Sequence, residues 1–264
     1  MELKASLIIT TYNRPDALVE VLKSVERQSL KPHEVIIADD GSSYETGKLI
    51  KDYSEYSKLE IQHAWHEDEG FRLSLSRNRA ILKSTGNYII LIDGDMILER
   101  DFIFDHVTNA KAGFFCQGSR LLLSEELTAK ILEGKNIDFH IFSPGISNKK
   151  HLVKSKILSS FFANRSKNDL RGIKTCNMSF FKDDCIKING FNNDFIGWGR
   201  EDTEFVVRLL NIGIKRRNLK FCAIQFHLWH PLYDRKGLSI NESLLRKTIE
   251  DSRTDCDNGI KQLF

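Results

Sequence analysis

Short apolar runs that alternate with amphipathic stretches dominate the first hundred residues of the chain. Four of these runs are rich in β-branched residues and suit strands buried on both faces, at residues 5–10, 34–38, 59–64 and 88–92. Between them, apolar residues recur at helical spacing, as Leu18, Val21 and Val25 do. Strands crossed by helices form a mostly parallel sheet. We therefore predict an α/β fold with helices flanking the sheet.

The expected helix ends depend on a few polar and glycine positions. Asn13 is placed to cap a helix that has Pro15 near its first position. Ser74 is placed to cap the next clear helix, and Gly86 can end it in a left-handed conformation. The sequence therefore predicts that Asn13 and Ser74 each cap the start of the helix that follows them, and that Gly86 ends the second helix.

The alternation loosens beyond Asp101, where a basic and less regular region begins. A second ordered block follows at about residues 176–230, and a final helix is expected at 240–256. We predict two halves of one domain, residues 1–110 and 111–264, with the smaller and less regular region in the second half.

Charge and composition exclude several classes of protein. A net charge of +3 gives no general field for nucleic acid, so we expect no nucleic-acid partner. The five cysteines are scattered, odd in number and without a C-x-x-C pair, which indicates reduced thiols and a cytoplasmic protein. The apolar runs are too short for a signal segment or a membrane span, so any membrane contact would be peripheral, at the inner face.

One local excess of positive charge lies between residues 144 and 175, where the only acid is Asp169. Its basic residues are Lys149, Lys150, Lys154, Lys156, Arg165, Lys167, Arg171 and Lys174. A solvated loop or helix face is the simpler explanation of such an excess. A patch that touches anionic membrane or an acidic acceptor is the alternative.

Two carboxylates, Asp93 and Asp95, follow the run YIIL at the end of a buried strand. Ligands bind at this edge of the sheet in open α/β folds. The pair can hold a divalent cation, which would neutralise the charge of a leaving diphosphate. An ordinary Asp-Gly turn explains the same residues without any function. A calcium EF-hand does not fit, because Ile97 stands where that loop needs an oxygen ligand.

A second acidic pair, Asp39 and Asp40, ends another strand and so lies at the same edge of the sheet. Asp40 is our candidate for a contact to a nucleobase or ribose, and capping of the helix that begins near Ser43 is the alternative. Thr10 and Tyr12 follow the first strand and add hydroxyl groups and a ring that can stack on a base. Simple packing explains Tyr12 almost as well.

A third group combines a glycine-flanked tryptophan with acids. Gly197 and Gly199 flank Trp198, whose flat ring can cover a sugar. Glu201 and Asp202 then open an amphipathic helix, where acids are often only partners of the helix dipole. A carboxylate held beside an acceptor hydroxyl can also act as a general base, and Asp202 is our candidate for that role.

Two histidines lie in an apolar, aromatic segment late in the chain. Such histidines are usually structural, but a neutral imidazole there could complete the ligands of a metal held by Asp95. We prefer His227 to His230 for this role. Glycine-rich dinucleotide and P-loop motifs are absent from the sequence, which leaves dinucleotide and ATP phosphate cradles without support.

Together, these segments resemble known enzyme families. The motifs IITTYNRP, EVIIADDGS, DEGFRLSLSRNRA and IDGDM resemble the family 2 glycosyltransferases of GT-A fold, a Rossmann-like α/β fold. The segment NMSFFKDDCIKINGFNNDFIGWGREDTEF resembles the C-terminal module of β-1,4-galactosyltransferases and the N-acetylgalactosamine-transferring half of bacterial chondroitin polymerases. The resemblance implies that residues 1–110 bind a nucleotide sugar and that residues 111–264 bind the acceptor and supply the catalytic base.

The resemblance also implies a role for each matching residue. The residues expected to hold the sugar nucleotide are Thr10, Tyr12, Asp40, Arg77 and Asp93. The expected metal ligands are Asp95 and His227. Trp198 would close over donor and acceptor, Glu201 would bind the acceptor, and Asp202 would supply the base.

The implied reaction is an inverting, single-displacement transfer from a UDP-sugar with Mn²⁺ or Mg²⁺. Relatives that retain anomeric configuration tend to have Glu-Asn where this chain has Glu201-Asp202. The resemblance favours galactose, N-acetylgalactosamine or N-acetylglucosamine as the sugar, and a glycan or lipid-linked glycan of bacterial surface polysaccharide synthesis as the acceptor. Arg200 replaces the small residue of many relatives and leaves the acceptor open. The alternatives are a sugar nucleotidyltransferase and a non-catalytic nucleotide-sugar or glycan-binding module.

Overall fold

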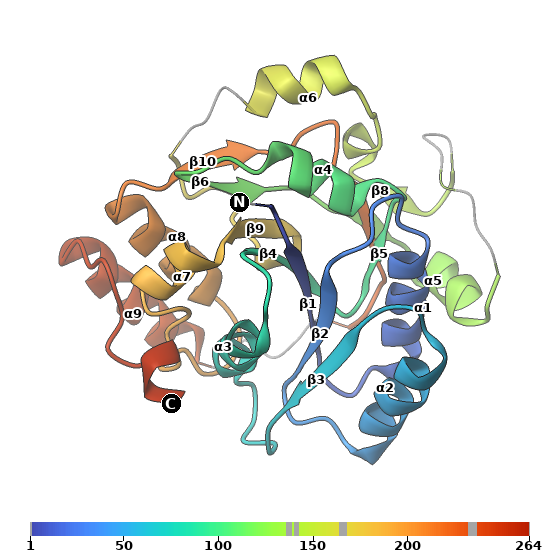
Figure 1. Cartoon of the computed structure of the whole chain (residues 1–264), viewed down its shortest axis with the longest axis horizontal. Coiled ribbons are helices and arrows are strands. Elements are labelled where there is room, and N and C mark those ends of the chain that lie inside the picture. Colours follow the sequence, from blue (N-terminus) through green and yellow to red (C-terminus); the bar gives the residue numbers. More distant parts are fainter. Residues whose placement is uncertain (1, 136–138, 140–142, 164–167, 232–236, 264) are drawn as a thin grey trace.

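The computed structural model describes residues 2–135, 139, 143–163, 168–231 and 237–263. Its larger sheet contains β1 (Ala5–Thr11), β2 (Glu34–Asp39), β3 (Ile61–Trp65), β4 (Tyr88–Asp93), β6 (Phe114–Gln117), β9 (Met178–Phe181) and β10 (Lys215–Asn218). These strands lie in the order β10-β6-β9-β4-β1-β2-β3 (Figure 1). The four strands predicted in the first hundred residues are confirmed, with ends that differ by at most two residues.

The larger sheet is mostly parallel, as predicted. β3, β2, β1 and β4 pair in parallel, and so do β6 and β10. β9 is antiparallel to both of its neighbours, β4 and β6. The pairing of β4 with β9 joins the two predicted halves of the chain in one continuous sheet.

A second, four-stranded sheet holds β5 (Met96–Leu98), β11 (Gln225–His227), β7 (Leu121–Leu123) and β8 (Ile146–Ser147), in that order. β5 follows β4 almost directly, and it pairs antiparallel with β11 so that His227 lies opposite Met96. This register places a late histidine next to Asp95, although 131 residues separate the two positions in the chain.

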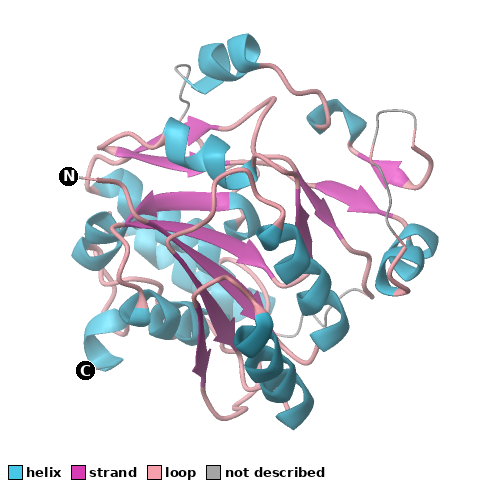
Figure 2. Cartoon of the chain, turned by 45° about the vertical axis from the view of Figure 1, so that its right-hand side comes forward, coloured by secondary structure: helices cyan, strands magenta, loops and turns pink. Residues whose placement is uncertain are grey.

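Helices cover both faces of the larger sheet (Figure 2). The helices are α1 (Pro15–Glu26), α2 (Tyr44–Tyr56), α3 (Leu73–Lys83), α4 (Phe102–Asn109), α5 (Glu125–Leu132), α6 (Lys156–Ala163), α7 (Lys182–Lys187), α8 (Glu201–Asn211) and α9 (Leu238–Glu250). Short 3₁₀ turns are η1 (Lys149–His151), η2 (Thr175–Asn177) and η3 (Ile260–Leu263). Alternate residues of β1 serve opposite layers, because Leu7 and Ile9 pack with α1 and α4 while Ile8 packs with α3 and α8.

The predicted cap at Asn13 is wrong. Helix α1 begins at Pro15 with Arg14 as its N-cap residue. Asn13 has a left-handed φ of 49° and accepts a 2.8 Å hydrogen bond from the Ser43 amide, so it ties the end of β1 to the loop after β2. The Asn13 side chain therefore makes a tertiary contact and does not cap the helix. Local sequence rules do not detect such a contact.

The predicted ends of α3 also need correction. Ser74 lies inside the first turn, and the N-cap residue is Arg72, whose amide donates a 2.9 Å hydrogen bond to Asp40 Oδ2. Gly86 does not cap the helix, which ends at Lys83. A Cβ at Gly86 would lie 2.4 Å from Ser6 Oγ, so the glycine allows a close approach to β1 instead.

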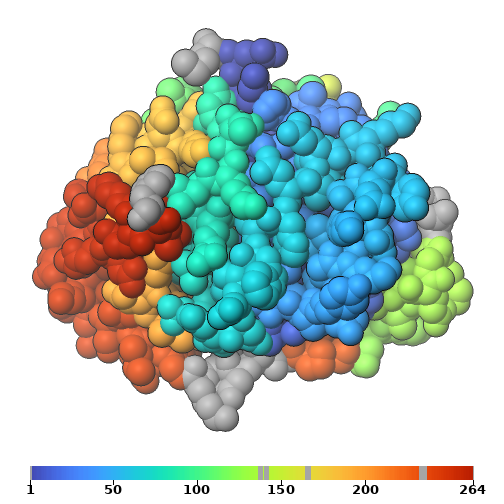
Figure 3. All heavy atoms as spheres, turned by 60° about the horizontal axis from the view of Figure 1, so that its bottom comes forward, coloured from blue at the N-terminus to red at the C-terminus, as the bar shows by residue number. Residues whose placement is uncertain are grey.

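The C-terminal part of the chain packs against α3. Helix α9 ends at Glu250, six residues before the predicted end, and Ser252 is left-handed with a φ of 48°. The final turn η3 contacts α3. Figure 3 shows the red C-terminal residues lying beside the blue-green residues of α3 on this face of the molecule. The helix that carries Arg77 is thus held between the N-terminal and C-terminal parts of the chain.

Candidate active site

The ends of β1 and β4 bring Thr10 beside Asp93. The two residues are register partners, and Thr10 Oγ1 donates a 3.1 Å hydrogen bond to Asp93 Oδ1. Gly94 donates its amide to the Thr10 carbonyl at 2.6 Å, and a Cβ on Gly94 would lie 2.7 Å from that oxygen. The glycine between the two acids is therefore required by the close approach of the chain to β1, and the turn it makes aims both carboxylates at one edge.

Asp95 lies within reach of two imidazoles. His227 Nε2 is 3.2 Å and His230 Nε2 is 3.4 Å from Asp95 Oδ2, and one ligand atom from each of the three residues lies within 4.8 Å of the others. The second carboxylate oxygen, Oδ1, is buried without a hydrogen-bond partner among the described residues. One carboxylate and two imidazoles suit a divalent transition metal such as Mn²⁺. The structure thus brings both candidate histidines to the acid.

Burial affects the two acids differently. It raises the pKa of Asp93, an effect that the Arg77 charge opposes only in part. At Asp95 burial also acts to raise the pKa, but the hydrogen bond and charge of His227 and the charge of His230 outweigh it, so the pKa is lowered. Asp95 is accordingly the more readily ionised of the two.

Arg77 connects the early acids to the late ones. Its side chain is 2% exposed; Nη2 lies 3.7 Å from Asp93 Oδ1 and Nη1 lies 3.3 Å from Glu201 Oε1. The guanidinium also lies over the ring of Phe191, 5.3 Å from its centroid. One buried cation on α3 therefore faces carboxylates from β4 and from α8, which brings these acids to the two sides of one guanidinium.

The pKa of Asp202 is raised strongly. Burial and then the negative charge of Glu201 raise its pKa to about 7, and the charge of Arg77 opposes the rise. The half-buried carboxylate accepts hydrogen bonds from Thr203, at 2.6 Å from the amide and 3.1 Å from the hydroxyl. The neighbouring Glu201 Oε2 is buried and has no partner among the described residues.

The Gly-Trp-Gly segment lies directly before these acids. Gly197 and Gly199 have φ values of 78° and 102°, which favour glycine, and Trp198 is 38% exposed. Asn241 Nδ2 on α9 donates to the Gly199 carbonyl at 3.0 Å, which fixes the end of the segment. Arg200 forms an ion pair with Glu242 on α9. Arg200, which stands where many relatives have a small residue, therefore pairs with helix α9.

Asp40 directly follows β2, the neighbour of β1 in the larger sheet. It is 4% exposed, lies 3.1 Å from His66 Nε2, and accepts the Arg72 amide. Asp39 instead accepts the Ser42 amide at 2.8 Å and lies 2.8 Å from His63 Nε2. Capping of α2 by Asp40 is therefore wrong, because Asp39 makes the contact to the loop before that helix.

Tyr12 lies at the exposed rim of this end. It is 41% exposed, and its hydroxyl donates a 2.8 Å hydrogen bond to Asp68 Oδ2. Core packing therefore does not explain this residue. The contact with Asp68 holds the ring over the loop that leads to α3.

Sequence reasoning missed Arg120, in the loop between β6 and β7. Its charge lies near both Asp93 and Asp95, and its Nη1 is 3.5 Å from Cys176 Sγ. Its Nε is buried without a hydrogen-bond partner in the described part of the chain. The tripeptide Gly-Ser-Arg has no spacing signal, so only the fold could place this second cation near the acids. His66, which lies 3.1 Å from Asp40, was also missed, because no spacing in the sequence places it near that acid.

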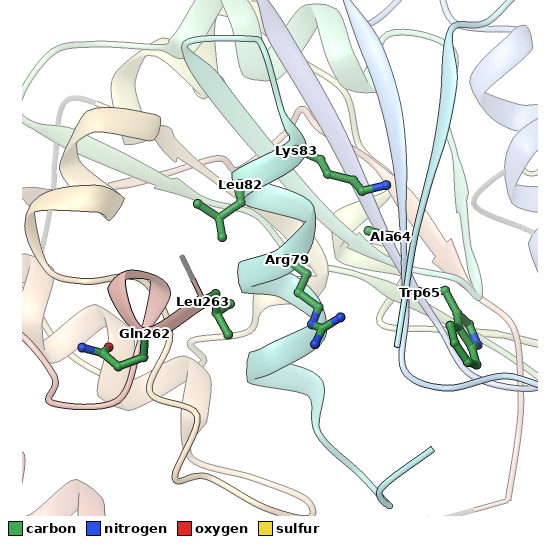
Figure 4. Close-up of a pocket in the computed structure, with 7 residues that line it drawn as sticks. All are labelled: Ala64, Trp65, Arg79, Leu82, Lys83, Gln262 and Leu263. Carbon is green, nitrogen blue, oxygen red and sulfur yellow. The ribbon is translucent and has the colours of Figure 1, made fainter. Parts of the chain in front are cut away.

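A separate hollow of about 460 Å³ lies between β3, α3 and η3 (Figure 4). Trp65, Arg79 and Lys83 line it together with Gln262 of the C-terminal turn. None of the predicted site residues is among its lining residues, so it is distinct from the group of acids around Arg77.

Two predictions from composition can also be compared with the structure. The cysteines are buried and free: Cys116, Cys176, Cys185, Cys222 and Cys256. The prediction of reduced thiols is therefore confirmed. No helix in the described ranges is long and apolar enough to cross a membrane.

The chain was compared with known proteins once the site was defined. Residues 6–182 match the family described as "Glycosyl transferase family 2", and residues 156–231 match "N-terminal domain of galactosyltransferase". The first match covers more than half of the chain. The chain belongs to glycosyl transferase family 2 and has the GT-A fold.

Two curated relatives are long synthases. The chain is 28% identical over 234 residues to a hyaluronan synthase of Pasteurella multocida, covering 79% of this chain and 23% of that protein. It is 24% identical over 277 residues to a chondroitin synthase of Escherichia coli, covering 92% of this chain and 38% of that protein. The chain therefore spans only a minor part of either synthase.

Solved structures support the fold. S. aureus TarS 1–349 in complex with UDP superposes with a TM-score of 0.64 at 15% identity, covering 98% of this chain and 68% of that one. A mannosyltransferase of Pyrobaculum calidifontis in complex with GDP-Man and Mn²⁺ gives 0.61 at 15% identity, covering 96% and 70%. At these identities the likeness concerns the fold alone.

Proposed function

We propose that the chain is an inverting, metal-dependent glycosyltransferase that moves a hexose or N-acetylhexosamine from a UDP-sugar to a glycan hydroxyl. The observation that carries the proposal is the position of Arg77 between Asp93 and Glu201. This cation links Asp93, two residues from the candidate metal ligand Asp95, to Glu201, which is next to the candidate base Asp202. A single displacement needs both at once, because the acceptor proton leaves as negative charge develops on the diphosphate.

At the metal end, Asp95 and His227 would hold Mn²⁺ or Mg²⁺, with His230 as a further ligand. The unpartnered Asp95 Oδ1 fits this assignment. When bound, the ion supplies positive charge that stabilises the leaving diphosphate. Arg77 and Arg120 add fixed positive charge beside the same acids, which favours a polyanionic donor over a neutral one.

At the acceptor end, Asp202 takes the proton from the attacking hydroxyl. A pKa of about 7 suits this role, because such a carboxylate is about half ionised at pH 7 and is more basic than an ordinary carboxylate. Glu201 lies beside it with one buried oxygen unpartnered, which an acceptor hydroxyl could satisfy. Trp198 is 38% exposed and would stack on the sugar.

At the nucleoside end, we assign Asp40 and Thr10 to polar contacts with base and ribose, and Tyr12 to stacking. Asp40 is buried, with Oδ1 3.1 Å from His66 Nε2 and Oδ2 accepting the Arg72 amide, so these two contacts hold its carboxylate at the edge of the sheet. UDP is favoured because the TarS complexes contain UDP and UDP-GlcNAc, although the mannosyltransferase binds GDP-Man. The proposal keeps galactose, N-acetylgalactosamine and N-acetylglucosamine as the donor sugars.

The relatives that make hyaluronan and chondroitin favour an acceptor in surface polysaccharide synthesis, either a glycan or a lipid-linked glycan. We place the reaction in the cytoplasm, with peripheral contact to the inner face of the membrane. In this proposal residues 1–110 bind the donor and residues 111–264 bind the acceptor. The residues from both parts meet at Arg77.

A donor screen tests the proposal. Purified chain would be incubated with a panel of UDP-sugars, GDP-mannose and Mn²⁺, and nucleotide release would be measured with and without oligosaccharide acceptors. We expect UDP release that Asp202→Asn abolishes while UDP binding persists. Release of pyrophosphate with a sugar phosphate would instead identify a nucleotidyltransferase, and UDP binding without turnover of any donor would identify a binding module.

A further inference from the structure

Helix α6 exposes three of its large apolar side chains, and the side chains that it buries fully are small. Ile157 is 84% exposed, while Leu158 and Phe161 are 42% and 49% exposed. The residues turned inward are Ser159 and Ala163, at 6% and 1%. A helix on a globular domain normally packs its apolar stripe against the core. Most of the apolar side chains of α6 therefore face away from the core, and Phe162 is the exception.

Specific contacts fix this orientation. Ser159 Oγ lies 2.9 Å from Cys222 Sγ, and the ring of Phe162 packs against Phe221 with centroids 5.5 Å apart. The helix stands at the rim of the molecule, beyond β6 and β10 (Figure 1). Its exposed apolar residues, spaced at i, i+1 and i+4, form one stripe that faces away from the protein.

Three exposed lysines lie on α6 or near it. Lys150, Lys156 and Lys220 are exposed, and Lys156 is the first residue of α6. Lys220 Nζ lies 4.7 Å from the centroid of the Phe162 ring. Burial lowers the pKa of His151 most, and the charges of Lys150 and Lys220 lower it further, so both lysines lie near this residue of η1.

Other members of the basic stretch are not part of this surface. Lys154 is bound to Glu99 at 2.9 Å and to Asp101 at 2.6 Å. Arg165 and Lys167 lie outside the described residues. Of the basic stretch, Lys150 and Lys156 thus lie on or near a helix whose apolar stripe charge counting did not detect.

We propose that this surface docks on an anionic lipid membrane; it consists of Ile157, Leu158, Phe161, Lys150, Lys156 and Lys220 and is called the α6 patch. Apolar side chains of an interfacial helix enter the headgroup boundary while lysines meet the lipid phosphates. The inference deepens the proposed function, since it would hold the transferase where lipid-linked glycans are elongated.

A second copy of the chain fits the α6 patch less well. A symmetric contact through α6 would place the lysines of one copy against the same lysines of the other, and like charges across an interface are unfavourable. An eight-residue helix is only about 12 Å long. It cannot supply the roughly 1,000 Å² that a stable interface buries. A lipid surface provides complementary charge and needs no matching protein area.

Sedimentation with lipid vesicles tests the docking. The full chain would be mixed with phosphatidylcholine vesicles with and without phosphatidylglycerol. We expect binding only to the anionic vesicles, and weaker binding at high salt. The pair Ile157→Ser and Phe161→Ser should lower the partition coefficient roughly tenfold, since it removes apolar area and keeps the charge. The pair Lys156→Glu and Lys220→Glu should lower it at least as much, by about tenfold or more.

A matched control is Ile240→Ser on α9, where the isoleucine is 66% exposed outside the α6 patch. This variant should bind vesicles like the wild type. Equal binding of the Ile157→Ser, Phe161→Ser protein, or equal binding to neutral vesicles, would overturn the docking. A dimer in sedimentation velocity that the same variant dissolves would identify a second copy as the occupant and equally overturn it.

Activity separates this inference from the proposed function. UDP release measured without vesicles should be unchanged in both double variants, because none of the four substituted residues is a candidate site residue. If the wild type binds anionic vesicles as expected but turns over no donor, the proposed transfer fails while the docking stands. If donor turnover is normal and vesicle binding is absent, only the docking fails.

Discussion

The ionisation of Asp202 determines how turnover should depend on pH. Burial and the negative charge of Glu201 give this carboxyl group a pKa of about 7. A general base acts only when deprotonated. One unit below its pKa a carboxyl group is ionised in only about one molecule in ten. We therefore expect kcat to rise about tenfold per pH unit below 7 and to level off above it.

The variant Glu201→Gln tests the cause of this shift. It removes the like charge beside Asp202 and keeps the shape of the side chain, so the midpoint of the kcat profile should move to lower pH. Glu242→Gln is the matched control, because Glu242 pairs with Arg200 outside the groove and its loss should leave the midpoint unchanged. The assay is UDP release at saturating donor and acceptor in overlapping buffers. An identical midpoint in wild type and Glu201→Gln, or a flat profile, would refute the reasoning.

The same pKa has a consequence for stability. Between the ordinary value of 3.8 and about 7, the folded protein binds more protons at Asp202 than the unfolded chain does. The free energy of unfolding should therefore fall as pH rises through this window. Asp202→Asn keeps the site neutral, so above pH 7 its Tm should exceed that of the wild type even though turnover drops by about 10²–10⁴-fold. A lower Tm at alkaline pH would contradict this assignment of the charge.

Three further predictions follow from the structure. Asp95→Ala should abolish the dependence of UDP binding on Mn²⁺ in calorimetry, and unchanged metal dependence would remove Asp95 from the metal site. Arg120→Gln removes a cation near Asp93 and Asp95, so it should weaken donor binding and raise the KM for the UDP-sugar. An unaltered KM would show that this charge does not reach the donor. Glu204→Gln leaves the fully buried Arg208 without its 2.7 Å carboxylate partner, so the free energy of unfolding in denaturant titrations should fall by about 3–5 kcal/mol. A loss below about 1 kcal/mol would refute this prediction.

The sequence predicted the sheet better than it predicted the helix ends. Apolar β-branched runs determine burial on both faces, so β1, β2, β3 and β4 were found within two residues. Helix ends depend on which partner a polar side chain takes. Asn13 bonds to Ser43 and the start of α3 is held by Asp40, contacts that lie 30 and 32 residues apart and have no local signature.

The acids of the site were predictable because each follows a strand or opens a helix, and in parallel sheets such positions converge. The choice between His227 and His230 was not predictable, since both imidazoles reach Asp95 Oδ2 with distances that differ by 0.2 Å, from 3.2 to 3.4 Å. Arg120 was not predictable either. Its place near the acids results from the crossover between the two sheets, which no spacing in the sequence encodes.

A crystal structure with UDP and Mn²⁺, analysed by anomalous scattering at the manganese edge, tests the central claim most directly. The account predicts one manganese peak between Asp95, His227 and the diphosphate, with the carboxylate of Asp202 opening onto the same groove. A peak at any other group of side chains, or a diphosphate bound on a surface that Asp202 does not face, would contradict it.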